Sequence, residues 1–235
     1  MPTIVFVSPK GGAGKTTSAL ILATQIARGK PVTIIDADPN HPINTWVKGG
    51  DKPDNLFVVS DVDEENITDK IDEAAEKTPF VIVDLEGTAS KIVVMAVSHA
   101  DFVIVPTQGS QLDAEQAGRA FKVINQHEKS VRRVQPDYKL PYSVLLTRTN
   151  PAIRTRTLKH IEHGLIEAGI PLFRTELHER EAYRAMFSFQ KTLHNLNSVE
   201  VANLDKAIAN AEAFSCEVIE SLRQSQREKS SKKQQ

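Results

Sequence analysis

Residues 3–17, near the start of the chain, contain a predicted strand, a glycine-rich loop at residues 10–14 and the beginning of a predicted helix. Residues 4–7, Ile-Val-Phe-Val, are a short apolar run of the kind found in buried strands. Residues 16–28 carry apolar side chains at helical spacing, and Lys-Gly-Gly-Ala-Gly-Lys joins the two segments. This order predicts a phosphate-binding loop, because glycine lets the backbone approach a phosphate closely and a helix N-terminus carries partial positive charge.

The loop offers phosphate ligands of two kinds, backbone and side chain. Backbone N–H groups can converge on phosphate oxygens, and the predicted nucleotide-binding residues of the loop are Gly11, Gly12, Ala13, Gly14, Lys15, Thr16 and Thr17. Lys15 is expected to reach the β- and γ-phosphates, and the Thr16 hydroxyl is expected to bind Mg²⁺. The alternative is a glycine turn that binds no ligand, but strand, loop and helix all agree with phosphate binding.

Two residues at the front of the loop depart from the ordinary P-loop pattern. Pro9 stands where that pattern has its first glycine, and Lys10 is a second lysine. Lys-Gly-Gly-Ala-Gly-Lys-Thr-Thr resembles the deviant Walker A motif of the ParA/MinD family of ATPases. The resemblance implies that ATP is the nucleotide and that Lys10 is a catalytic lysine reaching across a dimer to the partner's nucleotide. The alternative for Lys10 is a solvated loop lysine.

Carboxylates follow two of the predicted strands. Residues 32–35 form an apolar strand that ends in Asp36-Ala37-Asp38-Pro39-Asn40, and residues 80–83 form a continuous apolar strand that ends in Asp84. Carboxyl ends of strands lie beside the nucleotide in an open α/β sheet. The first segment resembles the family's first switch, so Asp38 would orient the attacking water and Asp36 would support the Mg²⁺ shell. The alternative is an Asp-Pro turn that caps the next segment.

The segment at residues 80–84 looks like a Walker B strand, in which Asp84 would hold Mg²⁺ through water. The Leu85-Glu86-Gly87 that follows differs from the family's commoner Asp-x-Pro-Pro. Gly87 could supply a mobile second switch, and the residues leave open whether Glu86 is catalytic or merely exposed.

Apolar strands alternate with helical segments along the rest of the chain, which predicts one doubly wound, mostly parallel sheet flanked by helices. Further strands are expected at residues 56–59, 101–105, 141–147 and 171–173, with helices at 67–77, 89–97, 153–168 and 204–222 and a helical segment beginning near 177. Residues 101–113 resemble the family's dimer face. Arg148 and Asn150 follow the strand from which the family reads adenine, although an ordinary loop asparagine is a close alternative.

Composition excludes several classes of protein. The chain has 235 residues, enough for one large domain, and its one cysteine excludes a disulfide framework and a cysteine-rich metal site. That cysteine, Cys216, lies in an apolar helical pattern and is expected in the core. No secretory signal or membrane-spanning run is expected. The formal charge is −1, but residues 223–235 carry +4, which predicts an ATPase domain at 1–222 and a basic, disordered tail.

The resemblance implies a cytoplasmic, nucleoid-associated ParA-type ATPase that drives plasmid or DNA segregation. ATP would close a homodimer that binds DNA non-specifically, and a DNA-bound adaptor of the ParB type would stimulate hydrolysis. Apart from the tail, the candidate DNA-binding residues are Arg154, Arg156, Lys159, Arg180 and Arg184. Alternatives are an accessory ATPase of conjugal DNA transfer, a metabolic ATP-dependent enzyme of the same fold and a scaffold that does not hydrolyse ATP. A membrane anchor is disfavoured because no apolar residue follows Leu222.

Overall fold

A computed structural model describes residues 1–9, 11–86 and 91–232, with the backbone alone at residues 111–114, 116 and 229–232. Seven parallel strands form one sheet in the order β3-β2-β4-β1-β5-β6-β7. The strands are β1 Thr3–Phe6, β2 Val32–Ala37, β3 Leu56–Val59, β4 Val81–Leu85, β5 Phe102–Gln108, β6 Tyr142–Thr149 and β7 Leu177–His178. The predicted doubly wound parallel sheet is therefore confirmed, and β3 is one of its edges.

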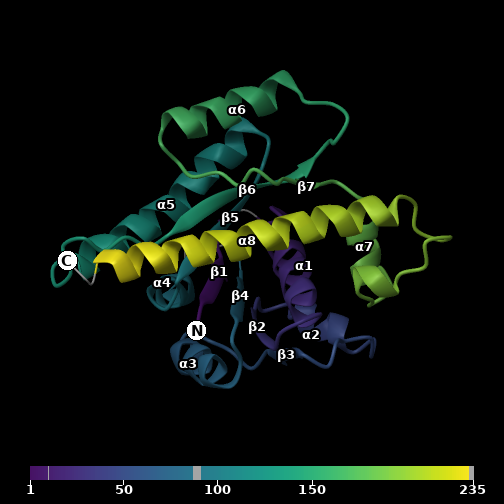
Figure 1. Ribbon diagram of the computed structural model, residues 1–235, viewed down its shortest axis with the longest axis horizontal. Helices are drawn as coiled ribbons and strands as arrows, with labels where there is room; N and C mark the ends of the chain where they lie inside the picture. Colours follow the sequence, from purple (N-terminus) through teal and green to yellow (C-terminus); the bar gives the residue numbers. More distant parts are fainter. Residues whose placement is uncertain (10, 87–90, 233–235) are drawn as a thin grey trace.

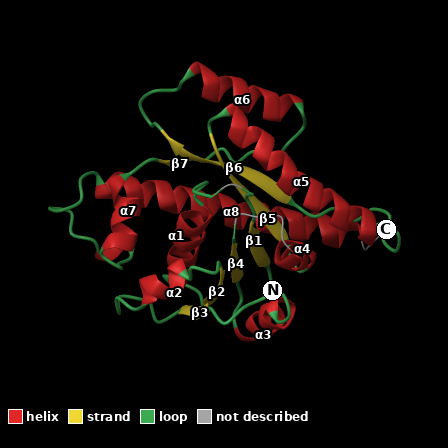
Figure 2. Ribbon diagram, turned by 180° about the vertical axis from the view of Figure 1, so that it is seen from behind, coloured by secondary structure: helices red, strands yellow, loops and turns green. Residues whose placement is uncertain are grey.

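Helices cover both faces of this sheet. They are α1 Lys15–Ala27, α2 Pro42–Val47, α3 Ile67–Lys77, α4 Lys91–Ser98, α5 Gln111–Val131, α6 Arg156–Glu167, α7 Glu181–Ser188 and α8 Leu204–Lys232, with the short 3₁₀ helix η1 Leu193–Asn195. In Figure 1 the long α8 crosses in front of the sheet. Figure 2 shows the molecule from the opposite side, where α3, α4 and α5 cover the other face.

Side-chain alternation along the strands builds two separate apolar cores. Ile4 and Phe6 of β1 pack with α1, α7 and α8, whereas Val5 packs with α3, α4 and α5 on the other face. Burial on both faces explains why the central strands are continuous apolar runs. This arrangement positions the N-terminus of α1 above the carboxyl ends of β1, β2 and β4, because α1 follows β1 directly.

The structure differs from the sequence prediction around the last strand. The strand expected at residues 171–173 is reduced to an isolated bridge between Leu172 and Val144, and the last strand of the sheet is β7. The Glu179 N–H still donates to Thr149 O (2.9 Å), so the backbone stays extended until α7 begins at Glu181. Long-range pairing with β6 therefore overrides the helical pattern that begins near residue 177.

The C-terminal region of the structure differs from the sequence prediction in two respects. Helix α8 continues through residues 223–232, which the sequence prediction placed in a disordered tail, and residues 233–235 lie outside the described residues. Arg, Gln, Glu and Lys are good helix formers, so a helix already nucleated and packed can propagate through them. Cys216 is exposed, because the buried stripe of α8 passes through Phe214 and Val218 instead. Within the described residues, no helix has the length and apolar character needed to cross a membrane.

Candidate nucleotide-binding site

The glycine-rich loop leads from β1 into α1 with two glycines in the left-handed region. Gly12 has φ 79° and Gly14 has φ 94°, and Gly14 is the N-cap of α1. Both conformations are costly for residues with a Cβ atom, which explains the glycine at each position. The Gly14 carbonyl accepts a hydrogen bond from Ser18 N–H at 2.9 Å, so the helix is formed from its first turn.

Two side chains from neighbouring strands hold the backbone of this loop. The Gln108 carboxamide of β5 donates to Gly12 O (2.8 Å), and the Thr147 hydroxyl of β6 donates to Ala13 O (2.8 Å). In a trans peptide the C=O and the next N–H point in opposite directions. Holding these two carbonyls therefore directs the N–H groups of Ala13 and Gly14 to the opposite side, as a phosphate cradle requires. The sequence prediction assigned neither side chain a role in the site.

The acidic side chains lie beside one another on adjacent strands. Asp36 of β2 and Asp84 of β4 are paired in register and fully buried. They follow Ile34 and Ile82 by two residues, so they point to the same face of the sheet as α1. Asp36 Oδ2 accepts hydrogen bonds from backbone N–H groups of α2, whereas Asp36 Oδ1 and both oxygens of Asp84 have no hydrogen-bond partner within the described residues.

Burial perturbs the protonation of three groups at this end of the site. Burial raises the pKa of Asp84 to about 7, and Asp36 adds to this rise. The Lys15 ammonium and the Thr16 hydroxyl, which is close to Asp84 but outside hydrogen-bond geometry, oppose it. Burial likewise raises the pKa of Asp36 against the hydrogen bonds from α2. For Lys15, only 6% exposed, burial lowers the pKa while the carboxylates of Asp84, Asp38 and Glu86 raise it. One buried cation is thus surrounded by carboxylates.

These residues fit a Mg²⁺ ion. Unpaired carboxylate oxygens in a dry site are costly unless a proton or a cation compensates them. The described residues contain no cluster of three or more His, Cys, Asp or Glu that could form a complete metal cage. Mg²⁺ does not need one, because it typically uses one or two protein oxygens together with water and substrate phosphates. Asp84, Asp36 and the nearby Thr16 hydroxyl supply oxygens of this kind.

Asp38 lies at the edge of the site and is only partly buried. Its Oδ1 accepts hydrogen bonds from the backbone N–H (2.9 Å) and the side-chain amide (3.1 Å) of Asn40. The alternative of a capping turn is therefore present in the structure, since Asp38 closes the turn at residues 38–40 and Asp36 caps α2. These contacts are compatible with the predicted Mg²⁺ role of Asp36, because its Oδ1 keeps no hydrogen-bond partner within the described residues.

A cavity of about 360 Å³ adjoins the glycine-rich loop. Its walls come from the start of α1, the end of β6, β7 and α7, with Gly14, Thr17, Arg148, His178, Arg180, Tyr183, Arg184 and Phe187 among the lining residues. Arg148, which has φ 53°, lines the cavity, but Asn150 does not. Instead, Asn150 Oδ1 accepts hydrogen bonds from Ala152 and Ile153 N–H (2.9 and 3.0 Å) and forms a local turn.

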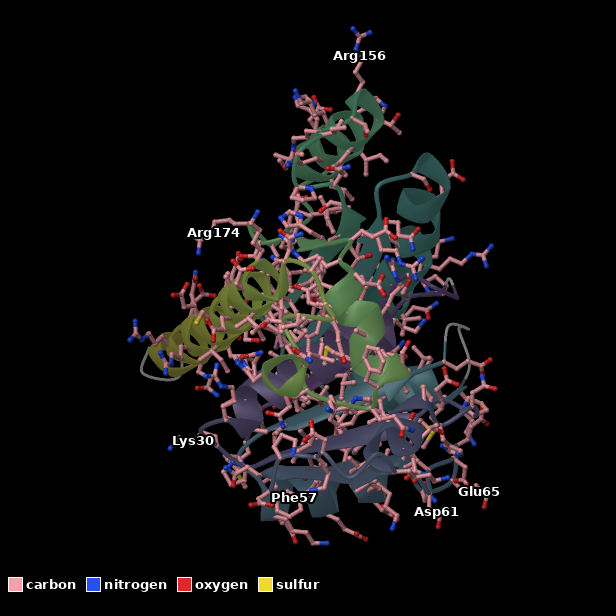
Figure 3. The ribbon with its side chains drawn as sticks, turned by 90° about the vertical axis from the view of Figure 1, so that its right-hand side faces the viewer. Lys30, Phe57, Asp61, Glu65, Arg156 and Arg174 are labelled. Carbon is pink, nitrogen blue, oxygen red and sulfur yellow. The ribbon has the colours of Figure 1, made fainter. Side chains whose placement is uncertain are left out.

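The five candidate DNA-binding residues do not form one basic surface. Arg180 and Arg184 line the cavity beside the glycine-rich loop, and Arg184 is paired with Glu179 and Glu181. Arg154 precedes α6 rather than lying on it and is paired with Glu162 (2.6 Å) and Glu176 (2.8 Å). Arg156 and Lys159 are exposed on α6 and have no ion-pair partner in the described part of the chain. Figure 3 shows Arg156 pointing away from the molecule.

Some predicted site residues cannot be placed. Lys10 and Gly87 lie outside the described residues. Glu86 is described and exposed, and its charge acts on Lys15, which places it near the loop.

Comparison with known proteins identifies the family. The sequence model of the family described as VirC1 protein matches residues 1–223. Protein ParA of Rhizobium radiobacter is 39% identical over 223 residues, which are 94% of this chain and 98% of that protein. The chain belongs to the VirC1/ParA family. The resemblance to ParA/MinD ATPases noted in the glycine-rich loop is thereby confirmed.

Other relatives of this VirC1/ParA chain agree. Protein virC1 of Rhizobium rhizogenes is 27% identical over 192 residues, 79% of this chain and 80% of that protein. The solved structure of a protein assigned to plasmid partition in Borrelia burgdorferi B31, bound to AMPPNP, superposes with a TM-score of 0.65 at 19% identity. That alignment covers 91% of this chain and 98% of the other, and it shows that the two share the fold.

The hydroxyl that holds the ParA-type loop can be tested directly. Thr147→Val keeps the shape of the side chain but removes the donor to Ala13 O, so we expect ADP affinity to fall about 5- to 30-fold, the effect of leaving one buried carbonyl unpaired. Titration calorimetry with ADP measures this change. The matched control is Thr33→Val, because Thr33 is another buried strand threonine whose hydroxyl contacts Thr78, away from the loop. Unchanged ADP affinity in Thr147→Val would show that the loop keeps its conformation without this contact.

Proposed function

We propose that this VirC1/ParA-family ATPase binds ATP and Mg²⁺, forms a dimer with ATP, binds DNA non-specifically and drives segregation or positioning of a DNA cargo. The observation that supports it best is the buried pair Asp36 and Asp84 with unpartnered oxygens, next to Lys15 and below the glycine-rich loop. A triphosphate with Mg²⁺ would compensate these carboxylates and engage the loop. We infer a cytoplasmic protein associated with the nucleoid.

Each residue of the site has a proposed role. Gly11, Gly12, Ala13, Gly14 and Thr17 supply backbone and hydroxyl groups around the phosphates, and Lys15 places its ammonium on the β- and γ-phosphates. Thr16, Asp84 and Asp36 would hold Mg²⁺ and its waters. Bound Mg²⁺ would neutralise charge that develops on the phosphates during transfer.

Hydrolysis and dimer formation depend on residues at the edge of the site. Asp38, partly exposed beside the buried acids, is the residue proposed to orient the attacking water. Lys10 is proposed to reach the partner's nucleotide, as the deviant Walker A motif implies. The cavity beside the loop has the size to accept the base, with Arg148 in its wall and Asn150 outside it.

The DNA-binding surface is narrower than the sequence alone predicts. Arg154 and Arg184 are compensated by glutamates, so the proposed contacts are Arg156 and Lys159 on α6. Basic residues at the end of α8 would add separate contacts. ATP-dependent dimerisation would double this surface and make the second contact intramolecular.

Replacing both α6 residues tests this proposal. For Arg156→Ala/Lys159→Ala we expect ATP-dependent DNA affinity to fall at least about tenfold at low salt, and the salt slope of log K to decrease by about 2, since two phosphate contacts are lost. Fluorescence anisotropy with a short duplex at several salt concentrations measures both. Lys70→Ala/Lys77→Ala on α3 is the charge-matched control, because Figure 1 shows α3 at the opposite end of the molecule from α6. DNA affinity that is equal with ATP, ADP or no nucleotide would refute the ATP switch.

An accessory role in conjugal DNA transfer is the second candidate that the resemblance to ParA-type ATPases implies. The two candidate functions share the ATPase chemistry and differ in the process that fails when the protein is removed. Deletion of the gene should raise plasmid loss per generation if the protein acts in partition, and should lower transfer frequency with normal inheritance if it acts in conjugal transfer. An adaptor of the ParB type is the partner expected in the first case.

A further inference from the structure

Helix α2 is attached at its N-terminal end to the acidic part of the site. Asp36 Oδ2 accepts hydrogen bonds from the backbone N–H groups of Ile43 (3.0 Å) and Asn44 (2.8 Å). The other oxygen, Oδ1, is buried and without a hydrogen-bond partner in the part of the chain that the structure describes. A cation drawn to Oδ1 therefore acts on the same carboxylate that holds α2.

The opposite end of α2 is attached to α7. The indole N–H of Trp46 donates to Met186 O (2.9 Å), and the side-chain amide of Gln190 donates to Thr45 O (2.9 Å). Trp46 is 2% exposed, so its hydrogen bond lies in the core. Phe187 and Ser188, the residues directly after Met186, line the cavity beside the glycine-rich loop.

The segments that directly follow α2 and α7 also approach each other closely, at Gly49 and Gln190. A Cβ atom on Gly49 would lie only 2.2 Å from Gln190 Cβ and 2.9 Å from Gln190 O. Gly49 does not need a positive φ, so the glycine provides space rather than conformational freedom. Gln190 itself has φ 52°, a left-handed conformation that places its backbone against Gly49.

We propose that α2 is a rigid connection through which Mg²⁺ at Asp36 tightens the α7 wall of the nucleotide cavity. Trp46, Gly49 and Gln190 are positioning residues in this connection and touch neither ligand. The proposal rests on the proposed binding of nucleotide and Mg²⁺ at this site. The connection implies a coupling free energy between Mg²⁺ binding and ADP binding. An ion that strengthens ADP binding through α7 must itself bind more tightly when ADP is present.

Gly49→Ala is the variant that tests the connection. A methyl group at this position must displace the backbone of Gly49 or Gln190, just after α2 and α7. Gly29→Ala is the matched control because nothing lies within 4 Å of a Cβ there. ADP is titrated by calorimetry in Mg²⁺ and in EDTA, and the ratio of the two affinities is compared. We expect Gly49→Ala to lower this ratio at least about threefold and Gly29→Ala to leave it unchanged, within the range of ordinary coupling between sites. Direct contact between Mg²⁺ and phosphate accounts for the part of the affinity ratio that Gly49→Ala retains.

Fluorescence gives a second readout that general destabilisation would not produce. Trp46 is the single tryptophan of the chain and lies within the proposed connection. Adding Mg²⁺ to the ADP complex should change its emission in the parent and in Gly29→Ala, and the change should at least halve in Gly49→Ala.

The outcomes separate the connection from the nucleotide site itself. A parent that does not bind ADP contradicts the proposed function, and with it the connection. A parent that binds ADP equally well in Mg²⁺ and EDTA overturns the connection together with the proposed Mg²⁺ site. A folded Gly49→Ala with the parent's affinity ratio and emission change overturns the connection alone. If Gly49→Ala does not unfold cooperatively, Gln190→Ala replaces it, with Gln224→Ala as control because that glutamine contacts Glu228 on α8.

Discussion

Lys15→Ala is expected to lower the affinity for both ADP and ATP by about 100-fold or more, as loss of a buried charge-assisted contact with phosphate implies. The Lys15 side chain is 6% exposed and its ammonium lies among the charges of Asp84, Asp38 and Glu86. Without it, these carboxylates would face the phosphates without the buried ammonium that lies among them. Calorimetric titration of each nucleotide in Mg²⁺ measures the loss, and hydrolysis should disappear with binding.

The control for this variant is Lys30→Ala, which removes an exposed lysine shortly after the end of α1. It should bind nucleotide as the parent does. If Lys15→Ala titrated like the parent while remaining folded, the glycine-rich loop would not be a phosphate site, and the proposed function would fail with it.

Asp38→Ala is expected to retain ATP binding and to reduce turnover about 100-fold or more, the usual effect of losing a positioned general base. ATP should accumulate on the protein in its dimeric form, because closure does not need the water-orienting carboxylate. Single-turnover hydrolysis measures the rate, and light scattering in ATP measures the dimer. The expectation follows from the place of Asp38 at the edge of the acidic site, next to the fully buried Asp36 and Asp84.

Asp38→Asn separates the chemical role from the turn that Asp38 closes. The amide oxygen can still accept the two hydrogen bonds from Asn40, so the turn at residues 38–40 should persist. Hydrolysis should be as slow as in Asp38→Ala if the carboxylate acts on water. A normal rate in Asp38→Asn would assign Asp38 to the turn alone and make Glu86, exposed near the loop, the next candidate.

The phosphate loop and the acidic strand ends could be predicted because their signals are local. Glycine spacing, apolar runs and the carboxylates that end them are properties of short segments, and parallel strands bring their carboxyl ends together at one edge of the sheet. Asp36 and Asp84 thus lie in register although 48 positions separate them. Edge strand β3 and the flanking helices follow from the same periodicity.

The partners of charged and polar side chains could not be predicted in this way. Arg154 appears basic in sequence, yet Glu162 and Glu176 neutralise it, and Arg184 lines a cavity instead of a DNA surface. Gln108 and Thr147 reach the glycine-rich loop across 96 and 134 positions of sequence. Neither contact leaves a pattern in the segment that carries the side chain.

By itself the sequence determined the family, the parallel α/β architecture and the chemical character of the loop and the acidic strand ends, because each depends on residue types at short spacing. The tertiary structure decided which carboxylate oxygens remain unpaired, which arginines stay uncompensated and how α2 meets α7 at Gly49 and Gln190. The physical reason is that burial and pairing depend on distances between segments far apart in the chain, and these distances are set only when the sheet has formed and its helices have packed.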